Sequence, residues 1–333
     1  MSQSSDISMS ARSAIGKVAD GRTVLGGASL RKWAARSTIW IFLAIALVVF
    51  SLLSPYFFTV YNLCNVLLQG AFVGFLAIGM TLIMINGNID LTVGSMLGLC
   101  ASLSVGLQDY GLGVAVIGAL AAGGLLGLLN GYLVERTGVD SFIVTLGGMI
   151  GIRGLVFVYT QENSLSASSD AFTNFGSMTI GPVSLIALVF LALLLLFQWV
   201  LSMTCHGRNA YAVGGNRVAA VNAGIRVSRH VIINFGLSGL LAAVAGITSA
   251  SQFGAATPNL GDTYELWAII AVVVGGTKLS GGVGSLWGTL GGVLTLAVLR
   301  NGLNLTHVQP FYVFIVMGVA LIGALLLDKQ FNR

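Results

Sequence analysis

Long apolar runs, separated by short polar interruptions, fill the chain from residue 38 to residue 328. An α-helix needs about 20 predominantly apolar residues to cross a bilayer. By that measure the pattern predicts ten or so spanning helices, at 38–53, 66–86, 90–107, 112–134, 142–160, 183–203, 230–250, 264–279, 285–303 and 311–328. The runs are continuous rather than alternating, which favours helices over a transmembrane β-barrel. We therefore predict an all-α polytopic membrane protein.

Composition agrees with this pattern. Of 333 residues, 56% are hydrophobic and 8% are charged, and the mean hydropathy is +0.92. Soluble domains are typically about 25% charged, so this class is excluded. The chain has 45 glycines and only four prolines, which is typical of membrane helices that pack closely through small residues.

The distribution of charge predicts the topology. Residues 1–37 are Ser-rich and basic and are interpreted as a cytoplasmic tail rather than a cleaved signal peptide. Basic side chains recur in the 204–229 loop and at 329–333, whereas the 161–182 loop contains Glu162 and Asp170 but no Lys or Arg. The positive-inside rule then places both termini, including the short 329–333 segment, in the cytoplasm and leaves 38–328 as the transmembrane domain. Arg300, near an outer end, does not fit this scheme unless it snorkels.

The stretch "GNIDLTVGSMLG" at 87–98 breaks an apolar run with Asn86, Asn88 and Asp90. Asp90 can cap a helix that begins near Leu91, because a carboxylate accepts hydrogen bonds from free N–H groups at a helix start. Alternatively, these residues form an unwound segment that lines a water-filled pathway. The sequence leaves both interpretations open.

A second polar interruption, "HGRNAYAVGGNRVAAVNAGIRVSRH" at 206–230, is basic and Gly-rich. It predicts a short helix, a turn, and a second helix from about Arg217 to Gly224. The predicted turn consists of Gly214, Gly215 and Asn216. Three alanines, Ala219, Ala220 and Ala223, would allow a partner surface to approach closely. The segment is either a docking element or an ordinary positively charged cytoplasmic loop.

The third motif begins at "TYEL", where Tyr264 and Glu265 open a predicted span that ends in glycines. Glu265 suits the positive end of a helix. Arg153 lies within another span, where an unpaired arginine costs about 2.5–3.5 kcal/mol on insertion scales. Glu265 and Asp90 are its predicted partners, and either an ion pair or a substrate contact would explain it.

Several other patterns indicate what the chain lacks. Its three histidines have no carboxylate or cysteine at metal-ligand spacing, and neither GxSxG, HExxH nor a GxxxxGK[ST] phosphate loop occurs. We expect no catalytic site, no metal, no nucleotide site of its own and no nucleic-acid partner. "VGSMLG" at 93–98 also resembles "VGSLWG" at 283–288, through either an internal repeat or chance.

Together these motifs resemble the permease subunits of bacterial ATP-binding-cassette sugar importers of the ribose/galactose/xylose type. The resemblance rests on "AIGMTLIMINGNIDLTVGSMLG", "GRNAYAVGGNRVAAVNAGI", "LSGLLAAVAGI", "YELWAIIAVVVGGTKLSGGVGSLWGTLGG" and "RNGLNL". It implies the ten-helix fold of vitamin B12-type importers, a homodimer in the bacterial inner membrane, cytoplasmic ATPase subunits and a periplasmic sugar-binding protein. Asn88 and Trp267 depart from the commonest family pattern.

The resemblance also implies functional residues. The 204–229 segment would couple to the ATPase through Gly207, Arg208, Gly214, Gly215, Asn216, Ala219, Ala220 and Gly224. A monosaccharide pathway would use polar and aromatic side chains, namely Gln69, Thr81, Asn86, Asn88, Asp90, Arg153, Tyr264 and Glu265. The chain itself would bind no cofactor, since ATP and Mg²⁺ belong to the partner ATPase. The alternative is an ion-coupled secondary transporter that uses Asp90 or Glu265.

Overall fold

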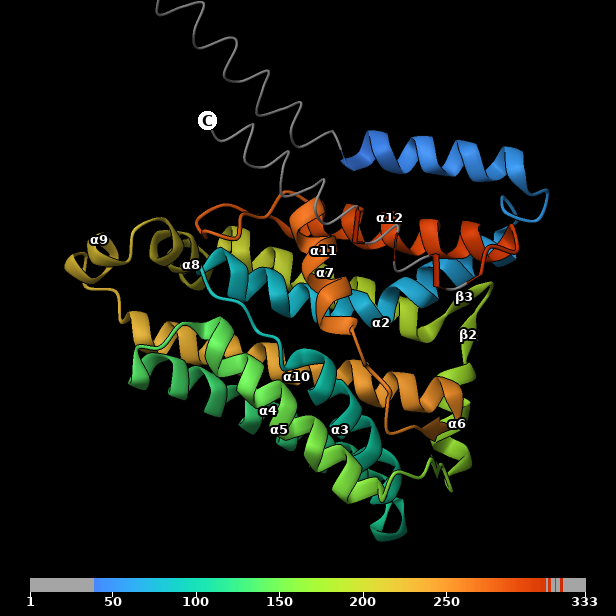
Figure 1. Ribbon diagram of the computed structural model, residues 1–333, viewed down its shortest axis with the longest axis horizontal. Helices are drawn as coiled ribbons and strands as arrows, with labels where there is room; N and C mark the ends of the chain where they lie inside the picture. The colour runs from blue at the N-terminus through green and yellow to red at the C-terminus, as the bar shows by residue number, and fades with distance from the viewer. Residues whose placement is uncertain (1–38, 310, 313–314, 316–317, 320–333) are drawn as a thin grey trace, which may run out of the picture.

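The chain forms a bundle of helices (Figure 1). The computed structural model describes residues 39–309, 311, 312, 315, 318 and 319. The first half contains a helix at Ile39–Leu53, then α2 (Val60–Ile85), α3 (Val93–Gly106), the short 3₁₀ helix η1 (Gln108–Tyr110), α4 (Leu112–Thr137) and α5 (Ser141–Thr160). The second half contains α6 (Asp170–Ser177), α7 (Leu185–Met203), α8 (Cys205–Gly215), α9 (Arg217–Asn222), α10 (Val227–Phe253), α11 (Tyr264–Val274) and α12 (Leu286–Leu305).

Every span predicted before residue 305 corresponds to a helix, although several limits differ. The predicted 66–86 segment starts earlier, at Val60, because Thr59 caps that end by accepting a hydrogen bond from the Asn62 amide at 3.3 Å. The predicted 264–279 segment ends earlier, at Val274, where the glycines begin. The predicted span 311–328 lies mostly outside the described residues.

Five helices in the described part of the chain are long and apolar enough to cross a membrane: α2, α4, α5, α7 and α10. The helix Ile39–Leu53, α3 and α11 are apolar but shorter. The structure therefore supports an all-helical, multi-pass architecture, and the number of ten spans stays a prediction.

Helix α10 lies at the centre of the bundle, against α4, α3 and α2. Glycines permit this packing, because backbones touch where a side chain would intervene. A Cβ atom on Gly239 of α10 would overlap the carbonyl oxygen of Gly123 on α4, and one on Gly127 would overlap that of Phe235. Two turns further along α10, a Cβ on Gly246 would overlap the carbonyl oxygen of Leu97 on α3. The many glycines therefore set the distances between the helices.

Polar side chains join α2 to α12. The Asn62 and Asn301 amides each donate to the carbonyl oxygen of the other, both at 2.9 Å, and both residues are buried. Near the other end of the contact, the Thr81 and Thr289 hydroxyls lie 2.7 Å apart. Buried polar groups need such partners in an apolar surrounding, so these pairs fix how the two helices align.

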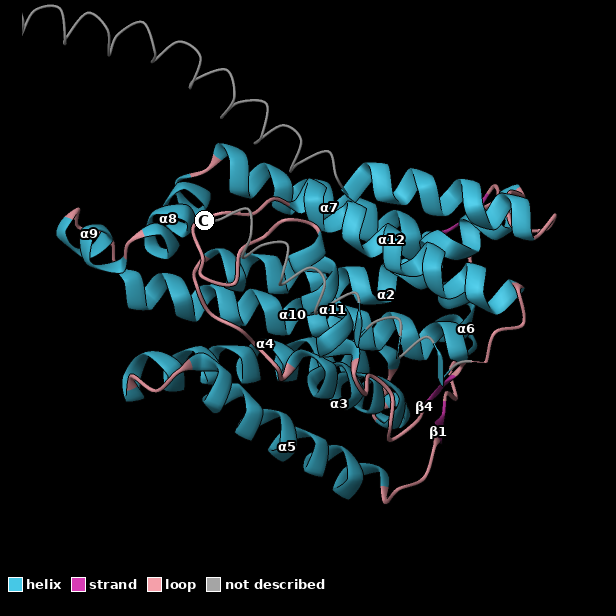
Figure 2. Cartoon of the chain, turned by 45° about the horizontal axis from the view of Figure 1, so that its top comes forward, coloured by secondary structure: helices cyan, strands magenta, loops and turns pink. Residues whose placement is uncertain are grey.

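The two ends of the bundle differ in structure. One end carries α8 and α9, and the other carries α6 and two short strand pairs, as both views show (Figures 1 and 2). β1 (Leu165–Ser166) pairs with the distant β4 (Ala255–Ala256), and β2 (Thr179–Ile180) forms a hairpin with β3 (Val183–Ser184), both antiparallel. The acidic 161–182 loop is thus folded over the end of α10, which the sequence did not predict. The loops at 161–182 and 204–229 lie at opposite ends, as the topology prediction requires.

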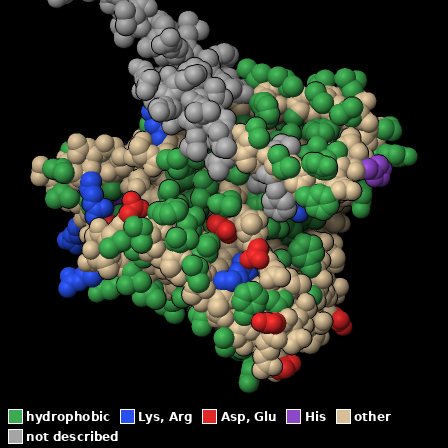
Figure 3. Space-filling model, in the orientation of Figure 1, with side chains coloured by type: hydrophobic (Ala, Val, Ile, Leu, Met, Phe, Trp, Pro, Cys, Tyr) green, Lys and Arg blue, Asp and Glu red, His purple; other side chains and the backbone are tan. Residues whose placement is uncertain are grey.

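Basic side chains gather at the end that carries α8 and α9 (Figure 3). This end holds Arg208 on α8, Arg217 on α9, and Arg226 and Arg229 at the start of α10. Glu162 and Asp170 of the 161–182 loop lie at the other end, where that loop has no Lys or Arg. The charge asymmetry seen in the sequence is therefore an asymmetry of the folded bundle.

The glycine contacts of α10 predict a large effect of a single side chain. Gly239→Val should lower the free energy of unfolding by about 3 kcal/mol or more, because the added carbons meet backbone that cannot move aside. The matched control is Gly113→Val in α4, where nothing lies within 4 Å of an added Cβ. Thermal unfolding of both purified variants in detergent measures the difference. Equal unfolding midpoints would show that the α4–α10 contact is not close-packed.

Candidate functional site

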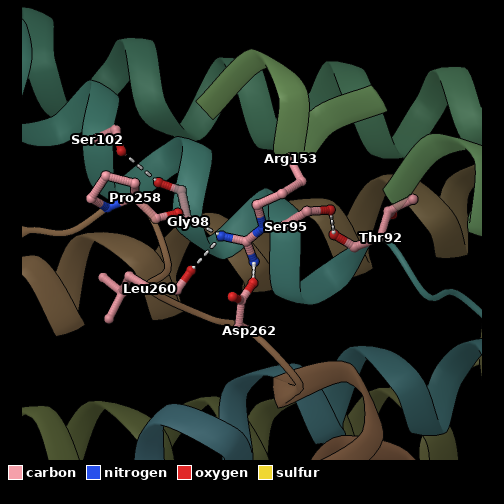
Figure 4. A network of polar contacts seen from close by, with 8 residues as sticks. All are labelled: Thr92, Ser95, Gly98, Ser102, Arg153, Pro258, Leu260 and Asp262. Carbon is pink, nitrogen blue, oxygen red and sulfur yellow. Dashed lines mark hydrogen bonds and ion pairs between the residues drawn. The ribbon is translucent and has the colours of Figure 1, made fainter. Parts of the chain in front are cut away.

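An arginine within the bundle joins helix α5 to the segment that precedes α11 (Figure 4). Arg153 donates through Nη1 to the carbonyl oxygens of Pro258 and Leu260, at 2.9 and 3.0 Å. Its Nη2 pairs with Oδ1 of Asp262 at 2.8 Å. The direct ion pair is therefore with Asp262 and not with the predicted Glu265 or Asp90, although Glu265 lies close enough to interact electrostatically with Arg153. The sequence drew attention to acids within or beside spans, whereas folding brings the connecting loop 258–262 against α5.

This ion pair lies at the edge of the bundle. The Arg153 side chain is 15% exposed and the Asp262 side chain is 53% exposed. The guanidinium is thus held by two backbone carbonyls and one carboxylate, while the outer part of that carboxylate faces the surroundings. Such an arrangement satisfies the charge of an arginine within a membrane protein, and it also presents a polar group on an otherwise apolar face.

Two glycines of α3 create the space for this cluster. A Cβ on Gly98 would lie 2.6 Å from the carbonyl oxygen of Leu260 and 2.9 Å from the Arg153 guanidinium. A Cβ on Gly94 would overlap the Glu265 carboxylate. Because residues four apart share one face of a helix, these two glycines form one flat surface. The "VGSMLG" motif therefore has a packing role beneath the site.

Helix α11 begins at this surface. Thr263, which precedes it, has a left-handed backbone (φ 66°), and Glu265 lies in the first turn and is buried. A buried carboxylate in the first turn is stabilised by the positive end of the helix. Tyr264 is half-buried beside it. Of the eight predicted pathway residues, folding gathers Arg153, Tyr264 and Glu265 at this one junction.

The break between α2 and α3 holds three further predicted residues. Asn86 ends α2 as its C-cap, Asn88 is half-buried, and Asp90 is completely buried. Oδ1 of Asp90 accepts hydrogen bonds from the backbone amide and the hydroxyl of Thr92, at 2.9 and 2.5 Å. Thr92 in turn accepts a hydrogen bond from Asn130 of α4 at 2.9 Å. Asp90 therefore fixes the shape of the turn and ties it to α4.

The prediction that Asp90 caps a helix starting near Leu91 needs correction. Helix α3 starts two residues later, at Val93, and Thr92 is its N-cap. The Asp90 side chain bonds to Thr92 and so closes the turn before the helix, a local arrangement that Asp favours. Whether this break also lines a pathway stays a prediction.

The remaining two predicted pathway residues lie elsewhere. Thr81 is buried between α2 and α12, where its hydroxyl is engaged by Thr289 and by its own helix. Gln69 is exposed in a shallow groove beside Trp267 and Arg300. The Arg300 guanidinium carbon lies 5.8 Å from the centre of the Trp267 ring, a cation–π contact. The arginine that did not fit the charge pattern therefore has a partner that the sequence did not indicate.

The 204–229 segment has the predicted order of helix, break and helix. Helix α8 ends at Gly215, Asn216 interrupts the chain, and α9 starts at Arg217. The Asn216 side chain caps α9 by accepting a hydrogen bond from the Ala219 amide at 2.9 Å. The other end closes at Gly224 (φ 81°), where Gly224 and Ile225 donate to the carbonyl oxygens of Val221 and Ala220. These two hydrogen bonds together form a Schellman motif, in which glycine is preferred at the left-handed position.

Two predicted glycines of this segment have other roles than expected. Gly214 and Gly215 belong to α8 and do not form the turn. Gly215 lies outside the left-handed region and has open space around it, whereas a Cβ on Gly214 would overlap the carbonyl oxygen of Ile85. The conformational need for glycine is thus at Gly224, and the steric need is at Gly214. Gly207 also has a steric role, because a Cβ there would overlap the carbonyl oxygen of Leu201 at the end of α7.

The prediction of an alanine docking face was wrong for its central residue. Ala220 is 3% exposed and packs into an apolar cluster with Val213, Val227 and Phe235. Ala219 and Ala223 are exposed, but the large exposed side chains of α9 are Val218 and Val221. The sequence missed these valines because a six-residue helix shows too little periodicity to reveal which side faces the bundle.

Helix α9 is also held by charge. Arg217 pairs with Oε2 of Glu135, at the end of α4, at 2.7 Å, and the Glu135 side chain is 5% exposed. The sequence did not identify Glu135, which is distant along the chain. With Ala220 buried and Arg217 paired, α9 is fixed on the bundle while its valines project outward.

Helix α8 rests on both Gly-rich breaks of the bundle. The Gly282 amide donates to the carbonyl oxygen of Ile85 at 2.8 Å, so the end of α2 and the 275–285 segment are directly joined. Tyr211 of α8 donates to the carbonyl oxygen of Gly284 at 2.9 Å. A displacement of α8 would therefore act on both breaks at once. Arg208, predicted for coupling, is exposed and donates to the sulfur of Cys205 at 3.0 Å.

The two similar hexapeptides start helices in different registers. Val93 is the first residue of α3, whereas α12 starts at Leu286, the fourth residue of the second hexapeptide. Ser285 caps α12 by accepting a hydrogen bond from the Gly288 amide at 3.1 Å, but Ser95 donates to the carbonyl oxygen of Thr92. The similarity thus does not extend to local structure.

Within the described part of the chain, no group of three or more His, Cys, Asp or Glu side chains could hold a metal ion. Most of the candidate functional residues are gathered at two locations. One is the α3–α5–α11 junction around Arg153, and the other is the α8–α9 element at the basic end.

Comparison with known proteins identifies the family. A family model described as the permease component of branched-chain amino acid transport systems matches residues 62–325. The ribose import permease protein of Escherichia coli (strain K12) is 40% identical over 311 residues, which cover 90% of this chain and 95% of that protein. The galactose/methyl galactoside import permease protein of Salmonella typhimurium (strain LT2) is 32% identical, covering 92% and 98%.

A third relative, the xylose transport system permease protein of Escherichia coli (strain K12), is 34% identical over 82% of this chain and 86% of its own length. No solved structure matches the chain. The resemblance to sugar-importer permeases drawn from the motifs is thus confirmed. The chain belongs to the family of transport permeases that this family model describes.

Proposed function

We propose that this chain is the membrane-spanning permease subunit of an ATP-driven importer that carries a monosaccharide of the ribose, galactose or xylose kind. The observation that carries this proposal is the similarity to sugar-import permeases along almost the whole chain, with 40% identity to a ribose permease. The ATP would be hydrolysed by partner subunits in the cytoplasm, and a periplasmic binding protein would deliver the sugar. The transporter would then work by alternating access.

The α8–α9 element supports the coupling step of this mechanism. Its exposed valines offer an apolar contact for the ATPase, surrounded by basic side chains. On the side that faces the bundle, Gly214 of α8 packs on the carbonyl of Ile85, and Tyr211 of α8 donates a hydrogen bond to the carbonyl oxygen of Gly284. A displacement of α8 and α9 would therefore act on the end of α2 and on the 275–285 segment. Rigid contacts of this kind transmit a displacement because packed interfaces deform little.

An exposed glycine face of α5 supports the proposed homodimer. Three glycines of α5, Gly147, Gly151 and Gly154, have open space where a Cβ would be. Membrane helices use such surfaces for close contact with another helix, so a second copy of the chain on this face would form the dimer. The Arg153–Asp262 pair lies on a different side of α5, against α3 and the 258–262 segment. The uncharged hydroxyls of a sugar suit polar groups such as Tyr264, which lies beside the pair.

The finer architecture belongs to the same proposal. Ten spans, the vitamin B12-type permease fold and cytoplasmic termini agree with the alternating charge and with the opposite placement of the two large loops. An ion-coupled carrier is less well supported, because Asp90 is buried and engaged by Thr92 and because the named relatives are import permeases.

The orientation can be tested with the chain's own thiol. Cys205 is exposed on α8 at the basic end, whereas Ser164 is exposed in the acidic loop at the other end. In intact cells a membrane-impermeant maleimide should label a Ser164→Cys variant in a Cys64→Ala/Cys100→Ala/Cys205→Ala background. It should label Cys205 of a Cys64→Ala/Cys100→Ala variant only after permeabilisation. Labelling of Cys205 from outside would reverse the proposed orientation.

Docking of the ATPase can be tested at α9. Val218→Asp and Val221→Asp should keep the permease in the membrane but abolish ATPase co-purification and sugar-stimulated hydrolysis in vesicles, because a charge replaces the apolar contact. Val139→Asp, at an exposed valine in the α4–α5 connection, is the matched control and should behave normally. Ala220→Trp would not discriminate, since it disturbs packing within the chain. If both α9 variants still co-purified with the ATPase and showed full sugar-stimulated hydrolysis, α9 would not be the docking surface.

The Arg153 cluster can be tested by a double-mutant cycle. Arg153→Gln should lower sugar uptake at least roughly tenfold, because the 258–262 segment loses its charged anchor. Asp262→Asn should have a smaller effect, since two carbonyls still hold the guanidinium. The double variant should be no worse than Arg153→Gln alone. Arg136→Gln, an exposed arginine at the end of α4, controls for lost charge. Normal uptake by Arg153→Gln would exclude a role for this cluster in transport.

A further inference from the structure

A cavity of about 390 Å³, open to the surface, lies at the basic end, between α8, the α9–α10 junction and the first two turns of α10. Its polar lining comes from Asn209, Arg226, Arg229 and His230, and its apolar lining includes Ile225 and Ile233. This volume is within the range of small-molecule sites in proteins, about 300–1,000 Å³. Of the residues predicted for coupling, only Gly224 lines it.

The two arginines of this cavity lack an acidic partner in the described part of the chain. Arg153 and Arg217 each pair with a carboxylate, whereas Arg226 and Arg229 form no ion pair with an acidic side chain in the described residues. Within those residues the same is true of three other arginines, namely Arg136, Arg208 and Arg300. The first turn of α10 contains no acidic residue, and its N-cap residue, Arg226, makes no side-chain cap. The cavity therefore combines two uncompensated cations with the positive end of a 27-residue helix. It is suited to an anion, and arginine binds phosphate particularly well.

An apolar strip leads from this cavity along α10 toward the middle of the bundle. Ile233 lines the cavity and is 37% exposed, and Leu240, two turns further, is 39% exposed. Leu237 and Val244 are half-buried on the same side. Residues at this spacing share one helix face. The anion-binding end and the apolar strip together match a molecule with a charged head and a hydrocarbon chain.

We propose that this cavity binds the phosphate headgroup of an anionic phospholipid and that an acyl chain of the lipid lies along the strip Ile233–Leu240. Basic pockets between membrane helices at the cytoplasmic side bind such headgroups, and the cytoplasmic leaflet supplies them. The headgroup would contact Asn209 of α8 and the α9–α10 junction at Gly224 as well as α10. The bound lipid would thus hold α8 and α9 together at the surface where the ATPase docks.

The test uses the full-length chain, purified from membranes in an uncharged detergent with any ATPase that accompanies it, and stripped of lipid. It is titrated separately with phosphatidylglycerol, phosphatidylcholine and inorganic phosphate, while native mass spectrometry counts bound lipid and thermal unfolding reports stabilisation. Phosphatidylglycerol should bind and raise the unfolding midpoint more than phosphatidylcholine does. The Arg226→Gln/Arg229→Gln double variant should bind phosphatidylglycerol roughly 30-fold more weakly, and Ile233→Ser should also weaken it.

Arg136→Gln is the matched control, because it removes an exposed arginine from the same end of the bundle without touching the cavity. It should leave lipid binding unchanged. Equal stabilisation by both lipids, or unchanged binding in the double variant, would overturn the proposal. Stabilisation by inorganic phosphate equal to that by phosphatidylglycerol would show a free-anion site and overturn the assignment to a lipid. Should the double variant not fold, Arg229→Gln and Ile233→Ser carry the same comparison. None of these outcomes depends on transport.

Discussion

The structure depends on the direct contact of helix backbones along α10. Gly239 meets Gly123 of α4, and Gly246 meets Leu97 of α3, at distances that leave no room for a side chain. In a membrane the hydrophobic effect gives little force between helices, so close packing has to provide it. Because α10 touches α2, α3 and α4, its position also fixes where the breaks of these helices lie. A central helix held in this way behaves as a rigid rod.

That rod connects the two ends of the molecule. At one end its first turn borders the α9 turn and the basic cavity, and at the other the strand β4 follows it and pairs with β1 of the folded 161–182 loop. The acidic loop is therefore an ordered cap rather than a flexible connection. Gln108 contributes to this cap by accepting hydrogen bonds from the backbone amides of Ser168 and Ser169, both at 2.9 Å. Both ends are thus anchored to the same helix, although their charges differ.

Several polar groups inside the bundle are held by a contact from a different part of the chain. Arg153 is held by carbonyls more than 100 residues away, Asn62 by Asn301, and Thr92 by Asn130. An apolar surrounding makes an unpaired polar group costly, so these contacts define the arrangement of the helices. They also explain how a chain with so few charges can fix polar side chains at defined positions.

The sequence by itself determined the class of protein, the positions of most helices, the difference between the two ends and the family. These properties follow from local quantities, namely apolar length, charge along the chain and motifs of adjacent residues. Only the tertiary structure decided the partner of Arg153, the burial of Ala220, the pairing of Arg300 with Trp267 and the role of Gly214. Each of these depends on which distant segment packs alongside, and at those positions periodicity carries no such information. The helix-break-helix order at 205–222 was readable because capping and glycine preferences act locally, but the direction in which α9 faces was set by the bundle beneath it.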